Sequence, residues 1–296
     1  MPTDFSDAGN NALNIAVELC RQNNAVLHLL HVVESRYIIT TPESGISLPA
    51  IVDEIDTHAR VRLYNMYESI IRTSGIAVQI HMPTGIPYDE ICEAANEMPI
   101  DLIVMGTHGA SGFREFFMGT TAYGVIKNTT KPVLTIPVNY LQVAFKSILF
   151  PVRPVQGIKE KFEFMQPFLL NNSSTHVHVA AICKKGQEED FQQNKEELFN
   201  ITRFLKENHI PATKKMYACN NFATKVLELA RLYAADLIVI NASLDYKWTQ
   251  FFVGPFTQQV VNHSRVPVLS FRLAMDVPAQ IKKDEQARYV AKNSGL

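Results

Sequence analysis

The sequence predicts an α/β protein built as two tandem doubly wound domains, each with a parallel sheet between helices. Two observations predict this class. Strand-like apolar runs alternate with helix-like segments along the chain. One series of segments also occurs twice: "DLIVMG" at 101–106 returns as "DLIVIN" at 236–241, and "KPVLTIP" at 131–137 returns as "VPVLSFR" at 266–272, both displaced by 135 positions.

The repeat has the length of a domain and is too long for a solenoid. Upstream, "MPTDFSDAG" at 1–9 aligns with "FPVRPVQGI" at 150–158, a displacement of 149 positions. The first copy therefore holds about fourteen additional residues, which we place within 34–60, as a flap or as an ordinary strand-to-helix connection. We expect a first domain at 1–140, a second at 146–273 and a polar tail at 274–296.

The elements of each copy follow in order from the hydrophobic pattern. Continuous apolar runs indicate strands buried on both faces, and apolar residues three and four apart indicate helices. In the first copy, strands are expected at 25–33, 78–82, 101–105 and 132–137, with helices around 12–19, 91–98 and 120–129. In the second copy, strands are expected at 147–152, 176–183, 214–218, 236–240 and 267–271, with Leu198, Ile201, Phe204 and Leu205 on one face of a helix. Ligands of such sheets bind beyond the carboxyl ends of the strands.

Charge and composition exclude several classes of protein. The formal net charge is −1, so charge does not suggest a nucleic-acid or membrane partner. No apolar run reaches the roughly 20 residues of a membrane span, and the polar N-terminus does not resemble a signal peptide. The four cysteines form neither a CxxC pair nor a zinc-like cluster, which favours buried thiols in a reducing cytoplasm.

Three glycines mark the candidate ligand site. Gly106 ends a predicted strand, Gly109 follows it, and Gly119 precedes Thr120 and Thr121 at the start of a predicted helix. Bare backbone allows close approach of a ligand, and the free N–H groups and dipole at a helix N-terminus favour an anion. The spacing matches neither GxGxxG nor the Walker motif. Taken alone, the glycines fit a phosphate-binding loop or a plain structural loop.

The motif Gly-x-x-Gly, nine residues, then Gly-Thr, between "DLIVM" and "KPVL", resembles the nucleotide-binding signature of the universal stress protein family. The opening "PTDFS" and the later "LLHVV" resemble the family's first strand–loop and second strand. The resemblance implies the adenine nucleotide alpha hydrolase-like fold with strand order 3-2-1-4-5. It also implies ATP as ligand, often with a divalent cation, and a role in survival under stress.

The resemblance also assigns residues. Pro2, Thr3 and Asp4 match the loop whose aspartate contacts adenosine, and Val32 matches a backbone position that contacts adenine. The end of the fourth strand and the phosphate loop are matched by Met105, Gly106, Gly109, Gly119, Thr120 and Thr121. No carboxylate cage for a metal is visible, so Mg²⁺ would be held mainly by phosphates and water.

The second copy keeps the fold pattern but not the site residues. Arg153 stands at the place of Asp4, Asn241 at that of Gly106, Leu244 at that of Gly109 and Pro255 at that of Thr120. Proline suits the first helical turn but lacks an N–H donor. We therefore predict one ATP site per chain, in the first copy.

Three functions stay open at this level. The first is a binding and signalling module, the second a slow ATPase or nucleotidyl transferase assisted by His108 or Thr120, and the third a scaffold without ligand. Because the family commonly pairs through its last strands, the strands at 132–137 and 267–271 are expected to join antiparallel in one chain, as a pseudo-dimer that can pair further as a homodimer. Only Met1 precedes "PTD", whereas "SILF" precedes "PVR", so we expect the natural start to lie upstream.

Overall fold

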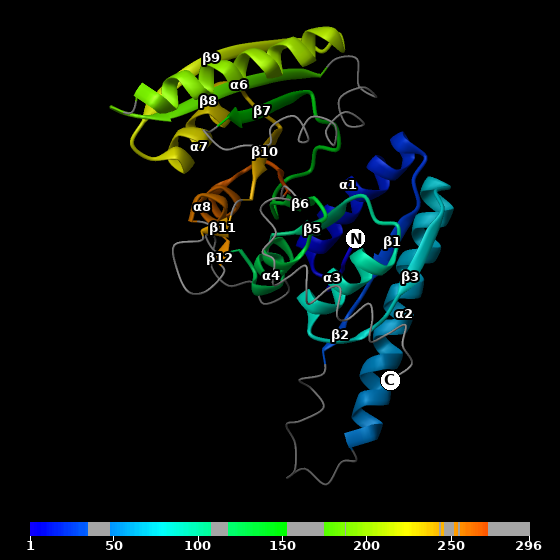
Figure 1. Cartoon of the computed structure of the whole chain (residues 1–296). Helices are drawn as coiled ribbons and strands as arrows, with labels where there is room; N and C mark the ends of the chain where they lie inside the picture. The colour runs from blue at the N-terminus through cyan, green and yellow to red at the C-terminus, as the bar shows by residue number, and fades with distance from the viewer. Residues whose placement is uncertain are drawn as a thin grey trace, which may run out of the picture.

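The computed structural model describes residues 1–34, 48–107, 118–152, 175–186, 188–242, 244–245, 252–253 and 255–271 (Figure 1). The predicted α/β class with two similar halves is confirmed. We call residues 1–140 the first half and residues 146–271 the second half. The polar tail at 274–296, like Gly109, His108 and Arg153, lies outside the described residues.

The second half contains a complete five-stranded parallel sheet. Its strands are β7 (Ser147–Val152), β8 (His176–Lys184), β9 (Ala212–Cys219), β10 (Leu237–Asn241) and β13 (Val268–Phe271). They lie in the order β9-β8-β7-β10-β13, which is the predicted order 3-2-1-4-5. Its helices are α6 (Glu188–Glu207), α7 (Phe222–Leu232) and α8 (Pro255–His263), and a short antiparallel pair joins β11 (Leu244–Asp245) to β12 (Phe252–Val253).

The strands of the first half are arranged as three separate parallel pairs. Its strands are β1 (Leu27–Leu30), β2 (Val33–Glu34), β3 (Val78–His81), β4 (Thr84–Gly85), β5 (Ile103–Gly106) and β6 (Val133–Ile136). Its helices are α1 (Asp7–Asn23), α2 (Leu48–Ser74), α3 (Pro87–Glu97) and α4 (Thr120–Asn128). In it β1 pairs with β3, β2 with β4 and β5 with β6, and Pro2 forms an isolated parallel bridge with Leu30.

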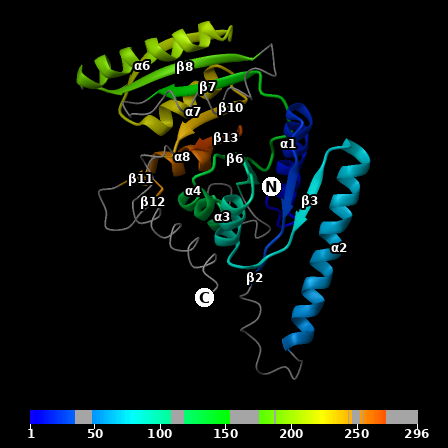
Figure 2. The same cartoon turned by 45° about the vertical axis from the view of Figure 1, so that its right-hand side comes forward.

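The two halves join through their last strands. β6 pairs antiparallel with β13, with Leu134 opposite Leu269, and the Thr135 hydroxyl donates to the Val268 carbonyl at 3.1 Å. The result is one seven-stranded sheet, in which β5 and β6 extend the five strands of the second half (Figures 1 and 2).

The core continues across this junction on both faces of the sheet. On one face, buried residues of α1 pack in the same cluster as those of α6, such as Ile15 and Ile201. On the other face, α3 and α4 share a cluster with α7 and α8, for example through Val125 and Val260. Burial of this apolar surface is the main term that holds the halves together.

Part of the region predicted to hold the additional residues is a long helix. α2 begins at Leu48, so 48–60 are helical rather than a connecting loop, and 35–47 lie outside the described residues. Its buried positions Ala59, Leu63 and Ile70 recur at helical spacing.

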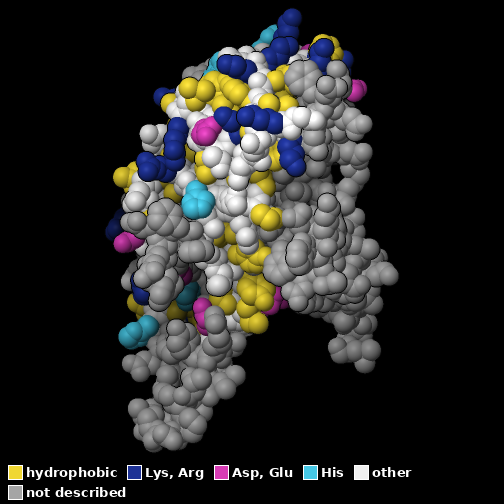
Figure 3. All heavy atoms as spheres, turned by 90° about the vertical axis from the view of Figure 1, so that its left-hand side faces the viewer, with side chains coloured by type: hydrophobic (Ala, Val, Ile, Leu, Met, Phe, Trp, Pro, Cys, Tyr) yellow, Lys and Arg dark blue, Asp and Glu magenta, His cyan; other side chains and the backbone are white. Residues whose placement is uncertain are grey.

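The outer edge of the large sheet is β9. Lys214 and Lys215 are exposed on it, and Lys and Arg side chains gather at this end of the molecule (Figure 3). Charged lysines on an edge strand oppose pairing with another sheet.

Candidate functional site

The predicted site residues that the structure describes meet at one edge of the first half. The start of α1 lies against the end of β5, since a Cβ added at Gly106 would lie 3.1 Å from Ala8. Gly119 in turn donates to the carbonyl of Thr107, directly after β5. Pro2 pairs with Leu30 at the end of β1, and helices α1 and α4 begin just after Pro2–Asp4 and Gly119. The topology thus gathers these segments where ligands of parallel sheets bind.

The backbone of Thr3 is fixed by β1. Its N–H donates to the Leu30 carbonyl at 2.8 Å, and its own carbonyl accepts a bond from Nδ1 of His31 at 2.8 Å. Thr3 is buried, whereas Asp4 is exposed. The Asp4 carboxylate accepts from the N–H and the hydroxyl of Ser6, at 3.1 and 2.5 Å, which orients the carboxylate at the start of α1.

Gly9 makes room for this carboxylate. A Cβ added at Gly9 would lie 3.1 Å from Oδ1 of Asp4. The helix N-cap is Ser6, whose hydroxyl accepts from the Gly9 N–H at 3.1 Å. The spacing of Asp4, Ser6 and Gly9 was visible in the sequence, but their mutual contact was not predicted.

His31 and Arg62 enclose Phe5 beside the predicted adenosine loop. The guanidinium carbon of Arg62 lies 4.3 Å from the centre of the Phe5 ring, and the His31 ring lies 4.4 Å from it. Arg62 also donates to the Phe5 carbonyl at 3.4 Å. Val32, the predicted adenine-contacting position, is buried directly after β1. Arg62 comes from α2, so sequence spacing gave no sign of its place at this edge.

The end of β5 shows a packing role for its glycine. Met105 is buried, and a Cβ at Gly106 would lie 3.1 Å from the backbone and the Cβ of Ala8. Gly106 therefore lets α1 approach β5 closely. The structure accounts for this glycine by helix packing, and its predicted contact with a ligand remains a prediction.

The start of α4 supplies the candidate phosphate-binding donors. Gly119 is the N-cap and offers no side chain to the helix, and its N–H donates to the Thr107 carbonyl at 2.8 Å. Tyr123 is the first residue to donate back, to the Gly119 carbonyl at 3.0 Å. The N–H groups of Thr120, Thr121 and Ala122 therefore have no acceptor within the helix. This geometry suits an anion.

The equivalent edge of the second half differs in the residues that are described. Asn241 is buried at the end of β10, and α8 begins at Pro255. The N–H donor of Thr120 is therefore absent at the matching position. Gly254 and the side chain of Leu244 lie outside the described residues.

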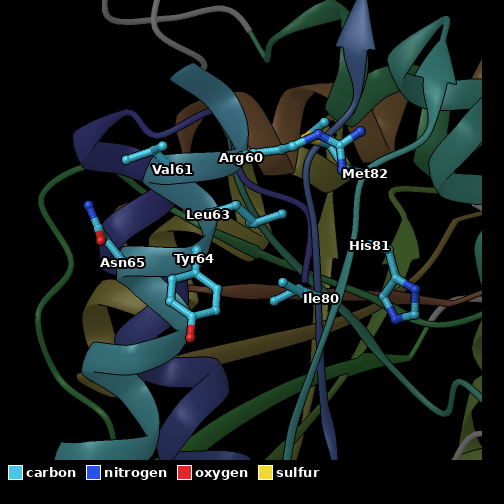
Figure 4. A pocket seen from close by; sticks show the side chains of 8 residues that line it. All are labelled: Arg60, Val61, Leu63, Tyr64, Asn65, Ile80, His81 and Met82. Carbon is cyan, nitrogen blue, oxygen red and sulfur yellow. The ribbon is translucent and has the colours of Figure 1, made fainter. Parts of the chain in front are cut away.

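Other features lie apart from this edge. A cavity of about 540 Å³ lies between α2 and β3, with Leu63 of α2 and Ile80 of β3 directed toward each other (Figure 4). It is lined by Arg60, Val61, Leu63, Tyr64, Asn65, Ile80, His81 and Met82. None of these is a predicted site residue, so this cavity and the predicted nucleotide site have no residues in common.

The described residues were also compared with the requirements of metal sites, disulfides and membrane-spanning helices. Among them, no three His, Cys, Asp or Glu side chains gather as metal ligands. All four cysteines lie outside any disulfide; Cys92, Cys183 and Cys219 are buried and Cys20 is half-buried. In this part of the chain, no helix combines the length and apolar character needed to cross a bilayer.

The chain matches the Universal stress protein family over residues 1–137 and 174–272. Universal stress protein MJ0531 of Methanocaldococcus jannaschii is 30% identical over 138 residues, covering 46% of this chain and 79% of that protein. Universal stress protein MJ0577 of the same organism is 31% identical over 147 residues, covering 46% and 91%. The crystal structure of a universal stress protein from Archaeoglobus fulgidus shares the fold, with a TM-score of 0.72, 18% identity and coverage of 92% of this chain and 96% of that one.

Proposed function

The chain belongs to the universal stress protein family, and from this premise we propose that it is an ATP-binding module with one nucleotide site, in its first half. The observation that carries the proposal is the proximity of three segments. The Asp4 loop is fixed on the end of β1 and leads into α1, which packs against Gly106 at the end of β5. Thr107, directly after β5, accepts a hydrogen bond from Gly119 at the uncapped start of α4. The resemblance of the glycine spacing to the family's signature supplies the identity of the ligand.

Each segment has a chemical role in this proposal. The carboxylate of Asp4 accepts hydrogen bonds from ribose hydroxyls or an adenine amine. The backbone at Val32 contacts the adenine. The N–H groups at Thr120 and Thr121, with their hydroxyls, bind the phosphates, and Gly109 and Gly119 leave the backbone bare. Any Mg²⁺ would be held by the phosphates and water.

The sequence of the second half argues that it binds no ATP. Asn241 puts a side chain where Gly106 has none, and Pro255 removes the N–H that Thr120 provides. A hydrogen bond to a charged group is worth about 1.5–3 kcal/mol, so this loss alone lowers affinity by roughly 10- to 100-fold. In this proposal, the second half pairs with the first as an intramolecular pseudo-dimer and takes the place of a second nucleotide-binding subunit.

The test is titration calorimetry of the full chain with MgATP. We expect one ATP per chain, recovered without hydrolysis. The variant Thr120→Pro is suited to the first helical turn, so it should fold normally. It should lose about tenfold or more in affinity, whereas Thr120→Ala, which keeps the N–H, should lose less.

Two results would contradict the proposal. Two ATP per chain would place a second site in the other half, and no ATP binding would favour a scaffold. Turnover of the bound ATP that disappears in Thr120→Pro would instead identify a slow ATPase at the same site.

A further inference from the structure

A residue of the second half holds the segment that leads into α4 of the first half. The N–H of Met118 donates to Oδ1 of Asn262 at 2.7 Å. Met118 precedes Gly119 directly, while Asn262 lies 144 residues further along the chain, in α8. Figures 1 and 2 both show α4 beside α8 and β12.

Two hydrogen bonds, one to each half, fix this segment. Met118 is bound by Asn262, and the next residue, Gly119, donates to the Thr107 carbonyl at 2.8 Å. Thr107 is itself held, since its N–H donates to the Ile136 carbonyl at 3.0 Å. The direction in which the N–H groups of Thr120 and Thr121 point therefore depends on one anchor in each half.

The anchor is not reciprocal. The displacement of 135 positions pairs Asn262 with Lys127 and Met118 with Val253. A lysine ammonium has no acceptor atom, so Lys127 cannot receive a bond from a backbone N–H. The second half can support the loop end of the first half by this contact, but the first half cannot return it.

We infer that Asn262 is a positioning residue for the phosphate-binding end of the first half, through which the second half raises nucleotide affinity. This inference rests on the proposed ATP site. A preorganised set of donors binds an anion more tightly than one that must be ordered on binding. Removing the anchor also leaves the half-buried N–H of Met118 without its acceptor.

The test compares Asn262→Leu, which has a similar size but no acceptor, with Gln259→Leu, the same chemical change at an exposed position of α8. The probes are MgATP and adenosine, measured by calorimetry on the full chain. Asn262→Leu should bind ATP about 3- to 10-fold more weakly than wild type. It should bind adenosine as wild type does, because adenosine has no phosphates. Gln259→Leu should change neither affinity.

Hydrogen exchange of the Met118 amide in the nucleotide-free chain gives a second readout. Exchange should be slow in wild type and Gln259→Leu, and at least about tenfold faster in Asn262→Leu. Should Asn262→Leu fail to fold, Asn262→Ala serves for both measurements.

The outcomes separate this inference from the proposed function. If wild type binds no ATP, the proposed function is wrong, and the positioning role of Asn262 is wrong as well. If wild type binds ATP and Asn262→Leu binds it equally well, the inference alone is overturned. Equal losses for ATP and adenosine would also overturn it, because they would indicate general damage to the fold.

Discussion

The two halves share one plan of strands and helices but differ at the position of the first strand. In the second half, β7 lies between β8 and β10 and completes a five-stranded sheet. In the first half, Pro2 forms a bridge to Leu30 of β1, and β5 pairs with β6. The comparison teaches that the sheet and the candidate site are unequally divided: the second half holds the more complete sheet, and the first half holds the candidate site.

The two halves also differ at the start of the matching strands β5 and β10. The motif "DLIV" gives Asp236 before β10 and Asp101 before β5. The Asp236 carboxylate accepts the N–H groups of Lys146 and Ser147 at 2.7 and 3.0 Å, at the start of β7. Asp101 is exposed. One aspartate thus fixes the joint between the linker and the second sheet, while its counterpart lies on the surface.

The largest difference between the halves should therefore come from these aspartates. Asp236→Ala leaves two backbone N–H groups without their carboxylate and should lower the free energy of unfolding by about 2–4 kcal/mol. The matched change Asp101→Ala should alter it by no more than about 0.5 kcal/mol. Urea unfolding of both variants, followed by circular dichroism, checks this. Equal effects of the two variants would mean that the halves are anchored alike.

A smaller effect is expected at Gly106. Its missing side chain lets α1 pack on β5, and a Cβ would meet the backbone of Ala8, which cannot move independently of the helix. Gly106→Ala should therefore lower the free energy of unfolding by about 1–3 kcal/mol. The same urea titration measures it. If Gly106→Ala leaves the free energy of unfolding unchanged, close packing of α1 does not explain this glycine, and ligand binding becomes the better explanation. A crystal structure of that variant would show whether α1 has shifted.

The smallest effect is a dependence of stability on pH, which arises from histidines on both halves. Burial lowers the pKa of His28, and so does the nearby His81, whose Nε2 lies 3.1 Å from Nδ1 of His28. The pKa of His81 is also lowered, mainly by burial. In the second half, burial and the neighbouring His176 lower the pKa of His178. The folded chain therefore binds protons less readily than the unfolded chain.

The sign follows from this difference. The contribution of these histidines to stability is fully present above about pH 6.5, the unperturbed histidine value, and is lost as the pH drops below it toward the lowered folded values. Unfolding by urea at pH 7.5, 6.5 and 5.5 should show the decrease. His81→Gln should reduce the slope by removing one histidine and one like-charge neighbour. A stability that rises on acidification in this range would contradict the assignment.

The sequence was sufficient to predict most of the repeated strands and helices. It was not sufficient to predict the side-chain contacts between them. Buried strands such as 103–106 and 237–241 were predictable because short continuous apolar runs are typical of parallel strands that are covered on both faces. Pairing of the last strands was expected from resemblance, and β6 does pair with β13. The helix over 48–60 was not foreseen, because its polar residues and Pro49 suggested a connection.

The contacts that complete the candidate site could not be predicted from the sequence, because they join residues far apart along the chain. Arg62 is placed over Phe5 by the packing of α2, across 57 positions of sequence. Asn262 reaches Met118 only because β6 and β13 pair. Neither residue belongs to a local motif, and the contacts of both are long-range ones that form only in the assembled fold.

The most direct test of the unequal division is a crystal structure of the full chain grown with excess MgATP. We expect one nucleotide, with its adenosine at Asp4 and Val32 and its phosphates at the start of α4, and no nucleotide beside Asn241 and Pro255. Density for ATP in the second half, or an occupied hollow between α2 and β3 with the first-half edge empty, would contradict it.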